Sequence, residues 1–80
     1  MENIKDILIF LKKEVKEKNV GLDENLIDNG ILDSLNFVKL ISKIEKKYKI
    51  KLSSYDISNQ KNFTYKKLSN LIFKQIKRKN

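Results

Sequence analysis

The chain has 80 residues, contains neither histidine nor cysteine, and has a formal net charge of +8 at pH 7. A chain of this length is expected to form one domain, residues 1–80, with a thin core. Without cysteine there is no disulfide, thiolate nucleophile or cysteine metal site, and without histidine the usual side chain for moving protons near neutral pH is missing. We therefore expect neither an enzyme nor a metal-binding protein.

The sequence has no apolar run of membrane-spanning length, and its first residues enter a charged amphipathic pattern that is unlike a signal peptide. These features predict a cytoplasmic protein without a transmembrane segment. We expect it to be a monomer.

A first helix is predicted over about residues 2–18. Apolar residues recur there at steps of three and four and form one stripe, which consists of Ile4, Ile7, Leu8, Leu11 and Val15. Residues 22–33 have no sustained helical period but contain several leucines and isoleucines, so we expect a loop that is held against the helices. Gly30 is expected to supply a backbone angle that a side chain would disfavour.

A second helix is predicted over residues 34–48. Its apolar residues cover a wide arc, which indicates contact with two or three other elements: Leu35, Phe37, Val38, Leu40, Ile41, Ile44 and Tyr48. Phe37 and Tyr48 are interpreted as core residues. A short helix over 54–58 and a last helix over 65–78 follow, so the sequence predicts an all-α fold, a small bundle of three main helices plus one short helix.

The start of the second helix has an unusual local sequence, because a polar loop with a glycine leads directly to Asp33 and Ser34. A hydroxyl at the first helical position is exposed, and a phosphate on it would lie beside free backbone N–H groups and the positive end of the helix dipole. Aspartate and serine are also ordinary helix caps, which is the simpler explanation of the pair alone. However, Phe37 stands where a capping box needs Glu or Gln, and a cap needs no apolar loop before it.

This segment, with the helix order and the apolar pattern after it, resembles the acyl carrier protein family over nearly the whole chain. In that family the serine of an Asp-Ser-Leu motif carries 4′-phosphopantetheine. The resemblance implies that Ser34 is the covalent attachment site and that Asp33 and Leu35 are the flanking motif residues. It also implies a non-catalytic carrier whose prosthetic thiol holds an acyl or aminoacyl group as a thioester, in fatty acid or secondary-metabolite biosynthesis.

The resemblance also implies partner enzymes. A phosphopantetheinyl transferase would move the arm from coenzyme A to Ser34 with magnesium. A ligase would load the acyl or aminoacyl group, and a downstream transferase would receive it. We further expect that Val38, Ile41 and Leu68 shelter an acyl chain.

The loop spacing leaves the cargo open. Ile31 and Leu32 separate Gly30 from the Asp-Ser-Leu motif, whereas fatty-acid carriers usually have one residue there. Two residues are more similar to D-alanyl carrier proteins and to free-standing aminoacyl or polyketide-type carriers. A D-alanyl carrier for cell-envelope modification is therefore an alternative.

The charge distribution departs from the family. Residues 19–34 contain acids and no base, while most of the basic residues follow them. Lys39, Lys43 and Lys46 share one face of the second helix, where typical acyl carriers have acids. We expect these lysines, together with Asp28 and Asp33, to contact partners, the lysines meeting acidic surfaces. A solvated lysine face produced by an AT-rich genome is the alternative.

Two further alternatives belong to other classes. The net charge alone is also typical of a small basic nucleic-acid-binding helical domain, although the long acidic connection before residue 34 does not suit a helix-turn-helix motif, so no nucleic acid is expected as a partner. A carrier-like protein that binds partners but is never modified is the other alternative.

Overall fold

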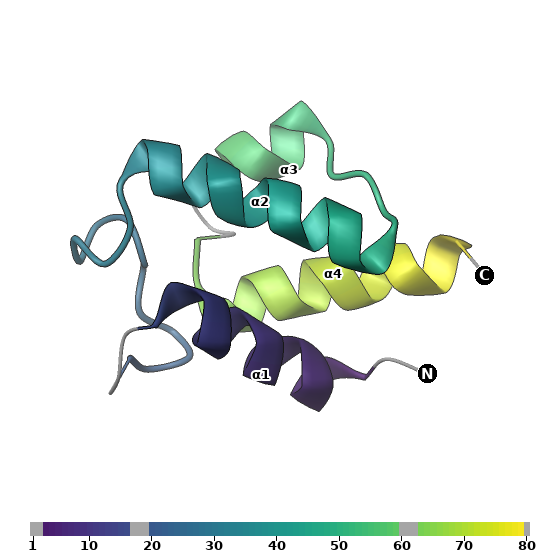
Figure 1. The fold of residues 1–80 in the computed structure, drawn as a ribbon, viewed down its shortest axis with the longest axis horizontal. Coiled ribbons are helices and arrows are strands. Elements are labelled where there is room, and N and C mark those ends of the chain that lie inside the picture. The colour runs from purple at the N-terminus through teal and green to yellow at the C-terminus, as the bar shows by residue number, and fades with distance from the viewer. Residues whose placement is uncertain (1–2, 17–19, 60–62, 80) are drawn as a thin grey trace.

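The computed structural model describes residues 3–16, 20–59 and 63–79. Within these residues it contains four helices and no strand: α1 (Ile4–Val15), α2 (Ser34–Tyr48), α3 (Ser54–Ser58) and α4 (Tyr65–Lys79). Figure 1 shows that α2 and α4 run in the same direction and α1 in the opposite one, with α3 beside α2. The predicted all-α bundle with one short helix is confirmed.

The core lies between the three longer helices. It is formed by side chains from every longer helix and by anchors in the connections, namely Ile7, Leu11, Leu26, Phe37, Leu40, Ile41, Ile44, Tyr48, Ile50, Leu52, Tyr65, Leu68 and Ile72. The rings of Phe37 and Phe63 lie 4.6 Å apart, and Phe10 meets Tyr48 edge-on at 5.7 Å. The interpretation of Phe37 and Tyr48 as core residues is thus confirmed.

The loop from residue 20 to residue 33 is fixed to the bundle by backbone hydrogen bonds. The N–H of Leu26 donates to the carbonyl oxygen of Phe63 at 2.8 Å, and the N–H of Lys66 donates to that of Leu22 at 3.0 Å. Leu26 itself is fully buried. Because these bonds join the loop to the start of α4, the loop holds its apolar residues against the helices, as predicted. Leu22 is the exception, since 41% of its surface is exposed.

The first helix is shorter than predicted. Asn3 caps it, with its side-chain oxygen accepting from the backbone N–H of Asp6 at 2.9 Å. Lys16 takes the left-handed conformation (φ 65°), and its N–H donates to the carbonyl oxygen of Lys12, which ends α1 at Val15. The prediction of helix at residues 2, 17 and 18 concerns positions outside the described residues.

The apolar arc of α2 is narrower than predicted. Leu35 and Val38 belong to it by sequence, yet 64% and 54% of their surfaces are exposed. The buried residues of α2 instead share the side that packs into the core with α1 and α4. Leu35 and Val38 therefore lie on the outer surface, one and four residues after Ser34.

Candidate functional site

Ser34 is the first residue of α2 and is exposed to solvent. Asp33 before it has extended backbone angles (φ −88°, ψ 175°) and acts as the N-cap: its carboxylate accepts from the backbone N–H of Asn36 at 2.7 Å. Its carbonyl oxygen accepts from the N–H of Phe37 at 2.9 Å, which is the first bond of the helix. Asp33 thus fixes the start of α2, and the Ser34 hydroxyl is left at the helix entrance.

Two backbone N–H groups at this entrance are available to a ligand. Within the described part of the chain, neither the N–H of Ser34 nor that of Leu35 donates to a protein acceptor. The first turn of α2 contains no acidic residue. Since the N-terminus of a helix attracts anions through such groups and through the helix dipole, a phosphate ester on Ser34 fits this position. Asp33 adds one negative charge beside it.

The loop before α2 is shaped by two local turns. The side-chain oxygen of Asn25 accepts from the backbone N–H groups of Ile27 and Asp28, at 3.0 and 2.8 Å. Gly30 has φ +72°, the angle that the sequence predicts to need glycine, and its N–H donates to the carbonyl oxygen of Ile27. Together the turns reverse the chain and deliver Ser34 to the end of the bundle where α1 ends and α4 begins (Figure 1).

A comparison with known protein families identifies the group to which this serine loop belongs. The model of the family described as phosphopantetheine attachment site matches residues 10–72, which contain all of α2. The chain belongs to this family. No curated protein and no solved structure matches it. Members carry 4′-phosphopantetheine covalently on a serine, so the chain is a phosphopantetheine-bearing carrier of the acyl carrier protein family.

The lysines of the second helix do not form one uniform face in the carrier. Lys39, Lys43 and Lys46 are all exposed, but Nζ of Lys43 lies 2.9 Å from Oε1 of Glu14 on α1. This hydrogen bond, helped by the positive charges of Lys43 and Lys16, holds the pKa of Glu14 below its ordinary value. Lys43 is therefore turned toward α1, while helical spacing places Leu35, Lys39 and Lys46 on a neighbouring line along α2.

Asp28 and Asp33 differ in their distance from Ser34 along the chain and in what their carboxylates contact. Asp33 is directly beside Ser34 and uses its carboxylate as the helix cap. Asp28 is exposed in the loop, where its backbone N–H is bonded to Asn25 and its carboxylate faces solvent. The structure thus brings Asp33 to the serine and leaves Asp28 on the loop surface.

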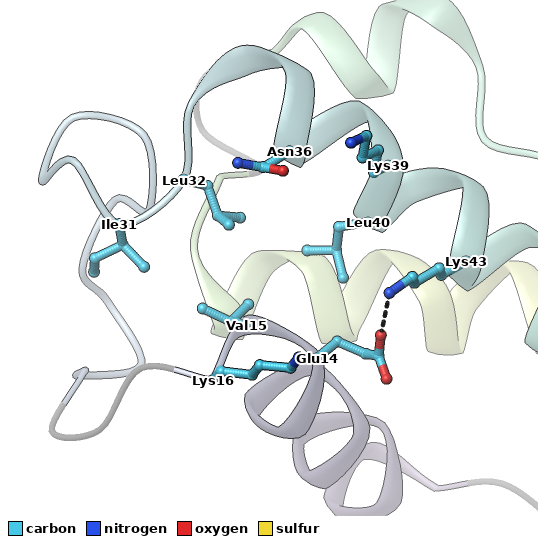
Figure 2. A pocket seen from close by; sticks show the side chains of 9 residues that line it. All are labelled: Glu14, Val15, Lys16, Ile31, Leu32, Asn36, Lys39, Leu40 and Lys43. Atoms are coloured by element: carbon cyan, nitrogen blue, oxygen red, sulfur yellow. Dashed lines mark hydrogen bonds and ion pairs between the residues drawn. The ribbon is translucent and has the colours of Figure 1, made fainter.

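A hollow of about 280 Å³ lies between the end of α1, the serine loop and α2. Figure 2 shows the side chains that line it. It is lined by apolar side chains and by a polar border, which together are Glu14, Val15, Lys16, Ile31, Leu32, Asn36, Lys39, Leu40 and Lys43. This hollow is not predictable from the sequence, because Glu14 and Lys16 are distant from α2 in the chain. We refer to it below as the α1–α2 hollow.

The predicted acyl shelter does not coincide with this hollow. Of its three residues, Ile41 and Leu68 are buried in the core and Val38 faces solvent, and none of them lines the α1–α2 hollow. The prediction of a shelter at Val38, Ile41 and Leu68 came from the wide apolar arc of α2. Packing of α2 on α1 and α4 uses that arc for the core instead.

The described residues hold no cluster of three or more acidic, histidine or cysteine side chains that would bind a metal ion. None of the helices, over the residues searched, is both long and apolar enough to cross a membrane.

Proposed function

We propose that this carrier holds an acyl or aminoacyl group as a thioester on a 4′-phosphopantetheine arm attached to Ser34, and presents it to partner enzymes. The observation that carries the proposal is the exposed Ser34 hydroxyl at the entrance of α2, directly after the Asp33 cap and beside the N–H groups of Ser34 and Leu35. The arm supplies the thiol that the chain itself lacks.

Attachment requires a phosphopantetheinyl transferase. The Ser34 oxygen forms a bond to the phosphorus that bears the pantetheine in coenzyme A, the diphosphate bond breaks, and adenosine 3′,5′-bisphosphate leaves. A base on the transferase takes the hydroxyl proton, since the carrier has no histidine to do so. The exposure of Ser34 lets the transferase reach it.

The carrier's own work is positional and not catalytic. Its fixed helix entrance tethers the cargo, so a loading ligase and a downstream transferase meet it at high local concentration. We propose Asp28 and Asp33 as contacts for the transferase, and Lys39, Lys43 and Lys46 as contacts for acidic surfaces of other partners. Lys39 and Lys46 are better placed than Lys43, because Glu14 neutralises Lys43. A cytoplasmic location stays a prediction.

The D-alanyl carrier is the second candidate for the cargo. The feature that favours it is the pair Ile31 and Leu32 between Gly30 and Asp33. The nucleic-acid-binding alternative has the net charge as its only support, and it predicts DNA or RNA affinity with a steep dependence on salt.

Intact-mass measurement tests the proposal. Incubation with coenzyme A, magnesium and a promiscuous phosphopantetheinyl transferase should add one phosphopantetheinyl group to the wild type and none to Ser34→Ala. Ser42→Ala is the matched control, because Ser42 is also exposed on α2 and should leave the gain intact. A wild type that gains nothing, or a Ser34→Ala variant that is still modified, would contradict the proposal.

A further inference from the structure

The α1–α2 hollow combines an apolar floor with a cationic border. Figure 2 shows Val15, Leu32 and Leu40 converging on its middle from the three elements that line it. The charged side chains of Lys16, Lys39 and Lys43 lie around them, and Glu14 is the single acid. The hollow is therefore suited to a group with a short apolar part and a negative end.

The positive charge of the hollow is not fully compensated. Glu14 is bound to Lys43 at 2.9 Å, and Lys16 also lowers its pKa, so the single carboxylate of the hollow interacts with two of the three lysines that line it. In the described part of the chain, Lys39 has no acidic partner. The border thus carries a net charge of about +2, with Lys16 and Lys39 as the groups that an added carboxylate would neutralise.

The hollow begins next to the tethering position. Leu32 precedes Ser34 by two residues and Asn36 follows it by two, and both line the hollow. From Ser34, Lys39 is five residues along α2, a rise of about 7.5 Å. Helical spacing directs the Ser34 side chain to the side of α2 opposite the hollow. A group tethered to Ser34 must therefore pass around the N-terminal end of α2 to reach the hollow. A phosphate held there by the N–H groups of Ser34 and Leu35 is the starting point of that path.

Asn36 adds a polar group on the same path. Its backbone N–H is used by Asp33, but its side-chain amide has no protein partner among the described residues. A side-chain amide both donates and accepts, so it suits the amide groups of a pantetheine arm that crosses the rim of the hollow.

We propose that the α1–α2 hollow receives a short acyl group that ends in a carboxylate, with its methylene groups on Val15, Leu32 and Leu40 and its carboxylate at Lys39 and Lys16. This inference rests on the proposed attachment at Ser34 and names the class of cargo. An aminoacyl group would bring a free ammonium to a border that is already positive, so the hollow disfavours D-alanyl cargo.

The test compares two cargoes of equal length. Coenzyme A analogues with an amine in place of the thiol, acylated with a succinyl or a butyryl group, are transferred to the protein by the promiscuous transferase. The stable amide prevents loss of the cargo during measurement. Methyl chemical shifts are then recorded, and the succinyl form should shift the methyl groups of Val15, Leu32 and Leu40 more than the butyryl form does. An alanyl analogue should shift them least.

Variants that remove one lysine charge show whether Lys39 causes the difference between the succinyl and butyryl forms. Lys39→Gln should reduce the difference between the succinyl and butyryl forms roughly two- to fivefold, the range of an exposed ion pair. Lys46→Gln is the matched control, because Lys46 lies on the same helix but outside the hollow, and it should leave the difference unchanged. Added salt should have the same effect as Lys39→Gln.

Equal shifts for succinyl and butyryl cargo, or shifts confined to other parts of the molecule, would overturn the inference. The experiment distinguishes a wrong cargo inference from a wrong proposed function. A protein that never gains the mass of the analogue contradicts attachment at Ser34, whereas a protein that gains the mass but shows no response in the hollow contradicts the cargo inference alone.

Discussion

Asp33 has two roles at the start of α2 that substitution can separate. Its carboxylate caps the helix through the N–H of Asn36, and the same carboxylate is the negative charge nearest to Ser34. The cap is a property of the free protein, since it needs only an oxygen acceptor at this position. The charge matters when a transferase approaches.

Asp33→Asn keeps a capping oxygen and removes the charge. We expect its free energy of unfolding to stay near that of the wild type, while Asp33→Ala loses about 1 kcal/mol. For both variants, kcat/KM of the phosphopantetheinyl transferase should fall roughly tenfold, as expected for a lost charge-assisted contact. Denaturant unfolding and single-substrate kinetics measure the two effects. An Asp33→Asn variant that is modified at the wild-type rate would remove Asp33 from the transferase contact.

Gly30 is the loop residue with a conformational requirement. Its φ is +72° and no heavy atom lies within 4 Å of a Cβ built there, so the backbone angle alone opposes a side chain. Gly30→Ala should therefore lower the free energy of unfolding by about 1–2 kcal/mol. Gly21→Ala is the control, because its Cβ would make ordinary contacts with Glu24 at 3.4 Å and more, at an angle without such strain. Equal losses in the two variants would show that the angle of Gly30 is not the cause.

At the scale of elements, α1 is joined to its neighbours in two ways. Its apolar stripe, with Ile7 and Leu11 fully buried, packs mainly on α4. Its end is joined to α2 by the bridge between Glu14 and Lys43, which spans 29 positions of the chain and borders the α1–α2 hollow. Burial of the apolar stripe therefore contributes more to stability than the exposed bridge does.

The bridge makes a specific contribution to the pH dependence of stability. Because Lys43 lowers the pKa of Glu14 in the folded protein below 4.5, the bridge stabilises the fold above about pH 4.5 and this contribution is lost as pH falls through the folded-state pKa. The difference in Tm between wild type and Glu14→Gln should therefore be present at pH 7 and shrink below pH 4.5. Thermal unfolding across this range measures it. A difference that grows at low pH would contradict the sign of the pKa shift.

How far the sequence predicts the elements depends on the range of the interactions involved. Helical periodicity suffices for the all-α fold, because the stripes of α1, α2 and α4 are local patterns. It fails for the end of α1, since Lys16 takes a left-handed angle for which glycine is the usual signal. It also fails for Leu35 and Val38, whose exposure depends on which side of α2 the other helices cover.

The functional site, like the helices, is predictable from the sequence only where it depends on neighbouring residues. The exposure of Ser34 and its place at the start of α2 follow from a few adjacent residues, so the sequence predicts them. The partner of Lys43 and the α1–α2 hollow depend on side chains of α1 and α2 that only the fold brings together. A family resemblance does not supply them, because both depend on side chains particular to this chain, such as Glu14 and Lys43.

The whole molecule has an uneven charge. The serine loop contains the acids Asp23, Glu24, Asp28 and Asp33, whereas the exposed surfaces of α2 and α4 are dominated by lysine. Such a distribution orients an approaching partner before contact and affects association rate more than affinity. A partner with an acidic docking surface would thus approach α2, the helix that begins with Ser34.

Charge reversal at two positions of α2 tests this orientation. Changing Lys39 and Lys46 together to Glu should lower kcat/KM of the enzyme that loads the carrier by about tenfold at low salt, and by less as salt increases. The matched control changes Lys74 and Lys77 of α4 to Glu, which alters the net charge equally on a different helix. Equal losses in the two double variants would mean that net charge, and not the α2 surface, is responsible.

Localisation of the prosthetic group is the most direct test of the central claim. The purified carrier, after modification by a phosphopantetheinyl transferase, is fragmented in the mass spectrometer so that each serine is separated from the others. We predict that every fragment containing Ser34 carries one phosphopantetheinyl group and that fragments with only the other serines carry none. A group located on any other residue, or a folded protein that no transferase modifies, would contradict the account.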